Sequence, residues 1–272
     1  MKRMVPVAWL LLVSGCVSAG PRQSATGQPL RVMTYNIQAG GGDVARVGAA
    51  IRESSPDIAA LQEVDVHWSS RSSFVDEADS LAKYLGMEVR FADIYDLPAT
   101  DSSRFRRQFG VAVLSRFPIT AFTNRSITRL STQSTNPTPS MAPGFLDATI
   151  DFHGTKIRVF NTHLDYRADP RVREQQVRDM LAVIGDSQLP TILFGDLNAG
   201  AAAPELAPLF AKLNDSWVAS RGPGLSYPAI NPEKRIDYVL TSRHFSVRDA
   251  HVAETLASDH RPVVVDLTLE HF

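Results

Sequence analysis

The sequence predicts an α/β (α+β) protein in which mixed β-sheets pack against each other and helices cover their outer surfaces. Two observations lead to this fold class. About ten segments have the β-branched and apolar composition of strands, whereas about four have helical periodicity. Many of the strands follow one another directly, as hairpins do, rather than alternating with helices. With 44% apolar and 21% charged residues, the chain has the composition of a globular protein that buries a core.

The expected elements begin at residue 30. Residues 31–37 are β-branched and aromatic, which predicts a strand, and the glycines at 40–42 end it. Asp43 is the expected N-cap of a helix that runs to about Ser54. The further elements expected are, in order, a strand at 58–62, a helix at 76–85, strands near 89–95, 109–115, 144–151 and 156–162, a helix near 170–185, a strand at 191–195, a weaker helical stretch near 204–212, and strands near 235–240, 246–253 and 262–269. Residues 126–143, rich in Ser, Thr and Pro, predict a surface loop.

The first residues of the chain have the composition of an export signal. Lys2 and Arg3 precede an apolar run at 4–13, which is too short to span a bilayer. The residues that follow, Val-Ser-Gly-Cys, end at Cys16 and resemble a bacterial lipobox. The resemblance implies that residues 1–15 are a signal peptide of the lipoprotein type and that Cys16 carries the lipid.

The segment after the expected lipidation site is small, polar and interrupted by Gly and Pro, so residues 16–29 are predicted to be a flexible tether. Residues 30–272 are then the folded domain. This organisation predicts an exported protein anchored by lipid to the bacterial cell envelope, most simply at the outer membrane. The alternative is ordinary cleavage after residues 17–19, which leaves a periplasmic or secreted protein.

Charge and cysteine content exclude several functions. The chain has 28 basic and 29 acidic residues, and loss of residues 1–15 lowers the basic count to 26, for a net charge of −3. This balance argues against binding to DNA by bulk positive charge. A single cysteine excludes an internal disulfide and a thiolate zinc site.

Polar residues stand at or beside the ends of apolar strands. They are Asn36, Glu63, His163, Asp196, Asn198, Asp237, Asp259 and His260. Any one of them alone is more often a turn former. Asp237 is harder to explain in that way, because it lies inside an apolar strand, where an acidic residue is costly to bury unless it is paired.

The residue types in this set fit one reaction. Carboxylate and amide oxygens are hard ligands that suit Mg²⁺ or Mn²⁺. Histidine is the side chain most readily poised between its charged and neutral forms near pH 7. Metal-bound carboxylates, an acid that activates water and histidines that hold a phosphate together indicate metal-assisted hydrolysis of a phosphate ester.

Six motifs occur in the order typical of the endonuclease/exonuclease/phosphatase superfamily: MTYNIQAG, ALQEVD, FNTHLD, FGDLNA, RIDYVL and SDHRP. The resemblance covers about residues 30–270, and the superfamily includes DNase I-like nucleases, abasic-site endonucleases, sphingomyelinases and inositol-phosphate phosphatases. It implies a single domain with a four-layer sandwich, in which two packed mixed sheets have helices outside.

The resemblance also implies roles for the residues of the motifs. It makes Glu63 the principal metal ligand, with Asp259 and Asn36 on the metal side of the site, and the metal Mg²⁺ or Mn²⁺. Asp196 is implied to activate the attacking water, and Asn198 to steady the phosphate or the metal shell. His260, oriented by Asp237, and His163 are implied to contact the phosphate or the leaving group.

Within the superfamily, the motifs TYNIQAGGG, LQEVD and LAKYLGM resemble small bacterial members related to the hydrolase-like domain of GPI-anchor remodelling proteins. Two departures from that branch concern the substrate contacts. Gly110-Val111-Ala112 stands where relatives have Gly-Asn-Ala, and Pro143-Gly144 stands where they have Arg-Gly. Arg71 and Arg107 are the candidate substrate-binding residues. Arg107 belongs to a group of arginines interleaved with phenylalanines, which is either an anionic-substrate patch or a solvated loop.

The function expected from the sequence is a divalent-metal-dependent phosphoesterase, in the first place a phosphodiesterase, at the cell envelope. Its partners are a phosphate-ester substrate, namely a phospholipid headgroup, a small phosphodiester or a nucleic acid, and the membrane through the lipid anchor. An extracellular nuclease of the same fold is one alternative. A non-catalytic lipoprotein that binds phosphorylated ligands is another. The oligomeric state stays open.

Overall fold

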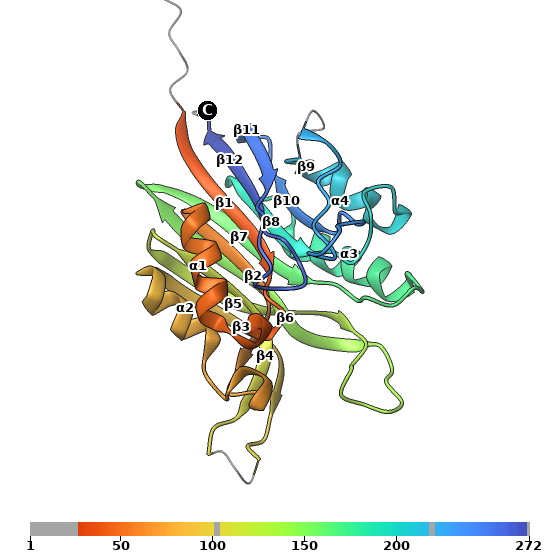
Figure 1. Cartoon of the computed structure of the whole chain (residues 1–272). Helices are drawn as coiled ribbons and strands as arrows, with labels where there is room; N and C mark the ends of the chain where they lie inside the picture. The colour runs from red at the N-terminus through yellow and green to blue at the C-terminus, as the bar shows by residue number, and fades with distance from the viewer. Residues whose placement is uncertain (1–26, 101–103, 218–220, 271–272) are drawn as a thin grey trace, which may run out of the picture.

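Two six-stranded β-sheets pack face to face with helices on both outer surfaces, in a computed structural model that describes residues 27–100, 104–217 and 221–270 (Figure 1). This confirms the expected fold class. The signal peptide predicted at 1–15, Cys16 and most of the tether predicted at 16–29 lie outside the described residues. No helix of the described part is both long and apolar enough to cross a membrane.

The first sheet has the strand order β11-β12-β1-β2-β4-β3. Its strands are β1 (Gln28–Asn36), β2 (Ile58–Val66), β3 (Glu88–Leu97), β4 (Arg107–Ser115), β11 (Phe245–Val252) and β12 (Val263–Leu269). β1 and β2 are parallel and every other neighbouring pair is antiparallel. β1 begins at Gln28, two residues before the expected start of the folded domain, because Gln28 and Pro29 already pair with the end of β12.

The second sheet has the strand order β5-β6-β7-β8-β10-β9. Its strands are β5 (Ile119–Arg129), β6 (Ser140–Phe152), β7 (Thr155–His163), β8 (Thr191–Asp196), β9 (Asn214–Asp215) and β10 (Asp237–Thr241). β7 and β8 are parallel, and the other pairs are antiparallel.

The long hairpin of β5 and β6 corrects the expected loop at 126–143. β5 extends to Arg129 and β6 begins at Ser140, so only the middle of that segment is a loop. The register of the pair shifts twice, which breaks the regular alternation by which a strand is recognised in a sequence. Ser and Thr residues also occur where β5 ends and β6 begins, and they are compatible with a strand. The Ser and Thr content of this segment was therefore a poor guide to its structure.

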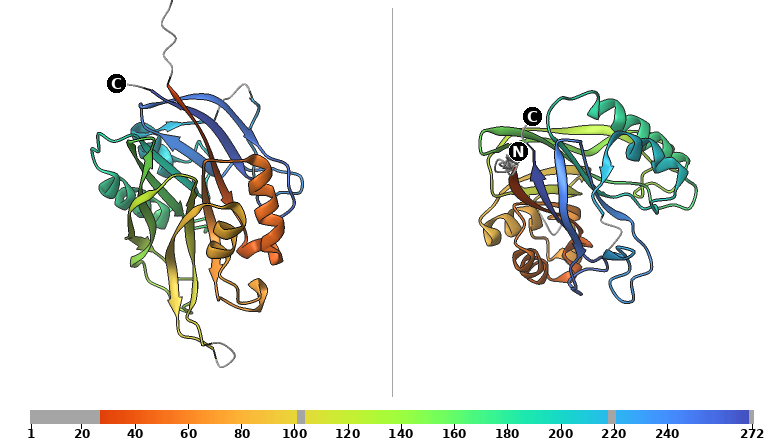
Figure 2. Two further views of the ribbon diagram at one scale, coloured as in Figure 1. Left: turned by 90° about the vertical axis from the view of Figure 1, so that its left-hand side faces the viewer. Right: turned by 90° about the horizontal axis from the view of Figure 1, so that it is seen from above.

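Four α-helices and three short 3-10 helices complete the described fold. They are η1 (Ala39–Gly42), α1 (Val44–Ser54), η2 (Ser70–Ser72), α2 (Glu77–Leu85), α3 (Arg171–Ile184), η3 (Pro204–Leu206) and α4 (Ala207–Lys212). α1 and α2 cover the first sheet, and α3 and α4 cover the second (Figure 2). Asp43 caps α1 by accepting from the backbone N–H groups of Ala45 and Arg46, as its sequence position predicts.

The helices and the two sheets form four layers, and an apolar core lies between each neighbouring pair of layers. One fills the space between the sheets, and the others lie beneath α1 and α2 and beneath α3 and α4. Because both sheets are covered on both faces, strands such as β8 are buried along their whole length. The parallel pairs β1/β2 and β7/β8 end at the same edge of the sandwich, and this edge carries the site.

Candidate active site

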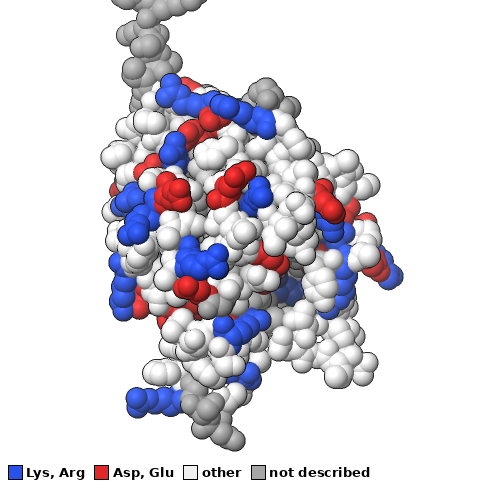
Figure 3. Space-filling model, viewed as in Figure 1, with Lys and Arg blue, Asp and Glu red and all other residues white. Residues whose placement is uncertain are grey.

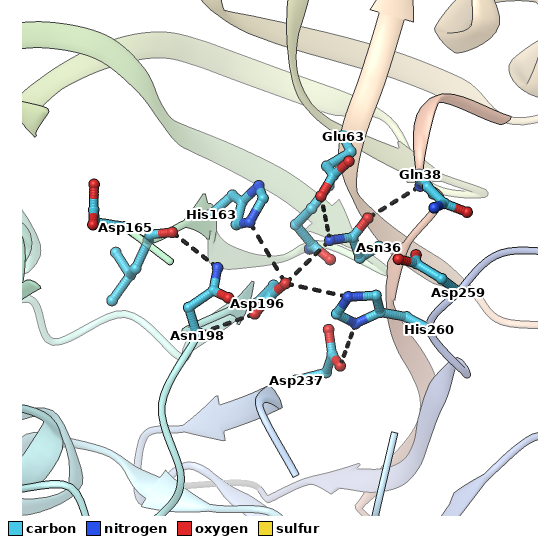
Figure 4. A network of polar contacts seen from close by, with 12 residues as sticks. Asn36, Gln38, Glu63, His163, Asp165, Asp196, Asn198, Asp237, Asp259 and His260 are labelled. Atoms are coloured by element: carbon cyan, nitrogen blue, oxygen red, sulfur yellow. Dashed lines mark hydrogen bonds and ion pairs between the residues drawn. The ribbon is translucent and has the colours of Figure 1, made fainter. Parts of the chain in front are cut away.

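The polar residues predicted from strand ends meet at one edge of the two sheets (Figure 4). Asn36 ends β1 and Asp196 ends β8. In the strand registers, His163 of β7 and Asp237 of β10 both pair with Asp196. The β7–β8–β10 register therefore places a histidine and two carboxylates side by side before any loop contributes.

Glu63 lies in an irregularity of β2 that aims its side chain at the site. The pairing of β2 with β4 shifts register between Leu61 and Val64, so Glu63 falls in a bulge. Its backbone has φ 55°, in the left-handed region that costs a non-glycine residue energy. Gln38 and Asn198 also have positive φ values, of 48° and 51°. Such strain clusters at functional sites, where surrounding contacts hold it.

The side chain of Asn36 joins the two sheets at the centre of the site. Its Nδ2 donates to Glu63 Oε1 over 3.0 Å and to Asp196 Oδ2 over 3.1 Å. Its Oδ1 accepts from the backbone N–H of Gln38 over 3.1 Å, and this sets the orientation of the amide. Asn36 therefore presents donors to both carboxylates and holds Glu63 in place. That its oxygen also binds metal stays a prediction.

Asp196 is fully buried and interacts with both histidines. Its Oδ2 lies 3.5 Å from His163 Nε2 and 3.7 Å from His260 Nε2, and its Oδ1 accepts from the backbone N–H of Asn198 over 2.9 Å. Burial raises its pKa to about 6, the nearby charge of Asp237 adds to this, and the two histidines oppose it. A carboxylate with this pKa is ionised at neutral pH yet binds a proton readily.

His260 is held by Asp237. Its Nδ1 donates to Asp237 Oδ2 over 2.9 Å, and Ser226 Oγ donates to the same oxygen over 2.5 Å. Burial disfavours the charged imidazole, but Asp237, Asp196 and Asp259 outweigh burial and raise the pKa of His260 to about 9. The pair with Asp237 leaves Nε2 directed at Asp196, and the tyrosine ring of Tyr227 packs 4.6 Å from the imidazole ring.

Two sets of described residues could hold a cation. Asp196, Asp237 and His260 have ligand atoms within 4.8 Å of one another. In that set Asp237 Oδ2 already accepts two hydrogen bonds, whereas Asp237 Oδ1 is buried and has no hydrogen-bond partner among the described residues. Glu63 and Asp259 form the second set. Burial raises the pKa of Asp259, His260 opposes this, and the Glu63 carboxylate raises it further. Two neighbouring carboxylates that repel each other are oxygen ligands suited to Mg²⁺ or Mn²⁺, so the residues fit such an ion.

Asn198 and the two predicted substrate arginines have mainly structural contacts. Asn198 Nδ2 donates to the carbonyl of Leu164 over 3.0 Å. Arg71 binds the fully buried carboxylate of Asp65 through Nε and Nη2, over 2.8 and 2.7 Å. Arg107 donates to a backbone carbonyl. Both guanidinium groups lie 5.7 Å from the ring centre of Trp68, so they belong to an aromatic cluster beside the polar network of Asn36 and Asp196.

Several supporting residues were missed in the sequence. Ser226 comes from a loop without a motif, and no pattern places it on Asp237. Asn161 lies within FNTHLD: its Nδ2 donates to the carbonyls of Leu61 and Ala112, and its Oδ1 accepts from Gln62 Nε2 over 2.7 Å. An uncharged amide inside an apolar strand was the available signal for Asn161.

The fold and the site together define a DNase I-like hydrolase of phosphate ester bonds. The model of the endonuclease/exonuclease/phosphatase family matches residues 33–260, and the chain therefore belongs to this family. Among curated proteins, no sequence matches. The finer resemblance to GPI-anchor remodelling proteins stays a prediction.

Solved structures share the fold at low sequence identity. An endonuclease/exonuclease/phosphatase from Beutenbergia cavernae is 24% identical with a TM-score of 0.65, covering 89% of this chain and 72% of that one. The human Nocturnin catalytic domain with bound sulfate is 22% identical with a TM-score of 0.66, covering 88% and 94%. A mannosyl-6-phosphatase from Bacteroides thetaiotaomicron is 19% identical with a TM-score of 0.63, covering 88% and 99%.

Proposed function

We propose that the protein is a divalent-metal-dependent phosphodiesterase of the bacterial cell envelope, in which an activated water attacks phosphorus in line. The observation that carries the proposal is the environment of one oxygen. Asp196 Oδ2 lies within 3.7 Å of Nε2 atoms from both His163 and His260, and it also accepts from Asn36, which holds Glu63. The candidate base, the two histidines and the candidate metal-binding carboxylate therefore lie close together around this oxygen.

Asp196 is the candidate general base. Its pKa of about 6 keeps it ionised at neutral pH and close enough to neutrality to accept a proton from water. The backbone N–H of Asn198 fixes its other oxygen, so the catalytic oxygen cannot rotate away without losing that bond.

His260 is the candidate stabiliser of negative charge on the phosphate. With a pKa of about 9 it is protonated at neutral pH, and Asp237 holds its ring through Nδ1. A fixed donor with a positive charge stabilises the transition state more than it stabilises the substrate. His163 is less buried and lines the neighbouring pocket, where it can donate a proton to the leaving group.

The metal would be held by Glu63 and Asp259, with Asn36 orienting Glu63. A bound Mg²⁺ or Mn²⁺ ion would offset negative charge on the phosphate oxygens. In the reaction the water oxygen forms a bond to phosphorus and the bond to one alcohol oxygen breaks. Asp196 takes a proton from the water, and the leaving alkoxide takes a proton from His163. The products are a phosphomonoester and an alcohol.

The envelope location rests on the N-terminal sequence. The predicted lipobox ends at Cys16, the only cysteine of the chain. The full chain should therefore fractionate with membranes, and the Cys16→Ser variant should not. Equal membrane association of both proteins would contradict lipidation.

A nuclease of the same fold is the second candidate. The aromatic cluster of Trp68 with Arg71 and Arg107 favours it, since such groups can stack bases and bind phosphates. Against it, acidic and basic residues are interspersed on the face shown in Figure 3, rather than gathered into a basic surface. Digestion of plasmid DNA alongside phospholipids and small diesters separates the two candidates.

The test of the proposed function is hydrolysis of bis-p-nitrophenyl phosphate with Mg²⁺ or Mn²⁺ and with EDTA. The wild type should release p-nitrophenol only with metal. Glu63→Ala and Asp196→Asn should each lose activity by on the order of 10³-fold or more while keeping the wild-type circular dichroism spectrum. Glu53→Gln, which changes an exposed carboxylate near the end of α1, is the matched control.

Near-full metal-dependent activity in Asp196→Asn would contradict the mechanism. Phosphate binding without turnover of any ester would instead support the non-catalytic binding protein.

A further inference from the structure

Two pockets open from the catalytic network on opposite sides. One is lined by His163, Asp165 and Glu63, and the other by Gln38 and Asp259. In Figure 4 His163 and Asp165 lie toward the left of the network and Gln38 and Asp259 toward the right, with Glu63, Asn36 and Asp196 between them. A substrate whose phosphorus lies at Asp196 and the histidines can therefore extend into both pockets.

The first pocket is aromatic. Besides Glu63 and His163, it is lined by the rings of Tyr95, Phe109 and Tyr166 and has a volume of about 190 Å³. We refer to it as the aromatic pocket. Tyr95 and Phe109 stack with ring centres 6.2 Å apart, and Tyr166 is 65% exposed at the rim. Its size and its walls suit one ring-shaped group.

The walls of the aromatic pocket are held in place from behind. Trp68 packs against both Tyr95 and Phe109, with ring centres 6.3 and 5.8 Å away. The hydroxyl of Tyr95 accepts from the backbone N–H of Thr132 over 2.8 Å. Arg129 is buried and donates to the backbone carbonyls of Pro143, Gly144 and His163. The pocket is thus formed before substrate binds, which reduces the entropy lost on binding.

The second pocket is aliphatic. Pro228, Ile230 and Leu256 line it beside Asp259, and its volume is about 280 Å³. We refer to it as the aliphatic pocket. Ile230 and Leu256 are 68% and 57% exposed, an unusual condition for two large aliphatic side chains that flank one hollow.

Two arginines hold the loops that carry these side chains. Arg46 donates to the carbonyl of Leu256 over 3.1 Å, and Arg261 donates to the carbonyl of Ala229 over 2.8 Å. The exposed side chains therefore sit on fixed backbone, as expected of a binding surface.

From this geometry we infer that the substrate is an asymmetric phosphodiester, with a ring-bearing group in the aromatic pocket and an aliphatic group in the aliphatic pocket. The inference rests on the proposed function. A monoester carries one organic group and leaves one pocket without a use, whereas a diester carries two. Binding energy from each group holds phosphorus at Asp196 and the histidines.

The test compares p-nitrophenyl esters that share the same ring: p-nitrophenyl phosphate, p-nitrophenyl methyl phosphate and p-nitrophenyl hexyl phosphate. Products are separated by chromatography, so cleavage of either ester bond is counted. The hexyl diester should have a KM at least about tenfold lower than that of the methyl diester, because its added methylenes leave water. Both diesters should be better substrates than the monoester.

Two exposed side chains provide variants that do not disturb the core. Ile230→Ser and Leu256→Ser should each bring the KM ratio of methyl to hexyl diester toward one. Leu189→Ser, at an exposed leucine outside both pockets, should keep the wild-type ratio.

The aromatic pocket is tested with inhibitors that cannot be hydrolysed. Phenylphosphonate should inhibit at a concentration about tenfold lower than methylphosphonate, since it adds a stacked ring. Tyr166→Ser should reduce this difference, and Leu189→Ser should not.

The outcomes separate this inference from the proposed function. Absence of metal-dependent hydrolysis of every ester, including bis-p-nitrophenyl phosphate, would overturn the proposed function. Glu63-dependent hydrolysis of bis-p-nitrophenyl phosphate with equal KM values for both alkyl diesters would overturn the inference alone. A preference for the monoester would overturn both the inference and the diesterase activity proposed above, and plasmid DNA as the best substrate would overturn the inference in favour of the nuclease.

Discussion

The side chain of Asn36, from the first sheet, donates a hydrogen bond to Asp196, from the second, over 3.1 Å. The same amide holds Glu63, so one uncharged residue links the candidate general base to the candidate metal ligand. Because the two carboxylates lie on different sheets, this link sets how far apart the sheets hold them.

Loss of this amide should therefore impair catalysis more than it impairs folding. Asn36→Ala is expected to lower kcat/KM by on the order of 10²-fold, because Glu63 and Asp196 lose their shared donor and their relative position. Steady-state kinetics and the concentration of metal needed for half-maximal rate measure the effect. Asn214→Ala, at an exposed asparagine of β9, is the control. If Asn36→Ala lost thermal stability but kept wild-type kinetics, the role of Asn36 would be structural only.

The pair of Asp237 with His260 predicts a shift of the pH–rate profile. In the wild type, activity should rise as Asp196 ionises near pH 6 and fall as His260 loses its proton near pH 9. The charge of Asp237 raises the pKa of both groups. Asp237→Asn should therefore move both limbs to lower pH and lower the maximal rate. Profiles of kcat/KM from pH 4.5 to 10 test this, with Glu53→Gln as the control. Limbs that stay at the wild-type pH would contradict it.

Glu77 at the start of α2 predicts a dependence of stability on pH. It is 1% exposed, and burial raises its pKa from 4.5 to about 8, despite a hydrogen bond from the backbone N–H of Asp65. Between these values the folded state binds a proton that the unfolded state has released, so the free energy of unfolding should fall as pH rises from about 5 to about 8.

Glu77→Gln removes this titration and keeps an oxygen for the N–H of Asp65. The variant should gain stability relative to the wild type at pH 8 by on the order of a few kcal/mol, with a smaller difference at pH 5. Urea unfolding at both pH values measures it. The idea fails if the two proteins show the same change in stability between pH 5 and pH 8.

The two arginines beside the site should have different effects when removed. Arg71→Ala leaves the fully buried Asp65 without its partner and should cost about 2–3 kcal/mol of stability. Arg107→Ala removes a guanidinium that donates to a backbone carbonyl, so it should raise KM for anionic substrates with little change in stability. Thermal unfolding and KM, measured on both variants, distinguish the roles. A large KM effect confined to Arg71→Ala would restore Arg71 as the main substrate contact.

The sequence alone singled out the polar residues that the fold brings together, because each of them follows, precedes or interrupts an apolar strand, and their catalytic roles stay predictions. Asp237 was the clearest example: an acidic residue inside an apolar strand needed a partner, and the structure provides His260 and Ser226. His260 was in the candidate set. Ser226 was not, because its loop has no strand pattern and its contact with Asp237 arises from folding.

Local pattern also failed where tertiary pairing overrides it. β5 was missed because register shifts disturb its alternation and because its Ser and Thr residues resemble a loop in composition. Arg71 was a candidate substrate-binding residue, whereas its principal contact in the fold is Asp65. Charge in a sequence indicates that a partner is needed, but it does not say which partner lies within reach.

What the sequence determined by itself is therefore the set of chemical groups, most of the division into strands and helices, and the family, since these depend on residue type and local order. The tertiary structure decided how the groups meet: Asn36 between Glu63 and Asp196, both histidines at one oxygen, and a pocket on each side of them. The contact of Asn36 with Asp196, for example, joins residues 160 positions apart. These arrangements follow from the packing of one sheet on the other, which no local pattern encodes.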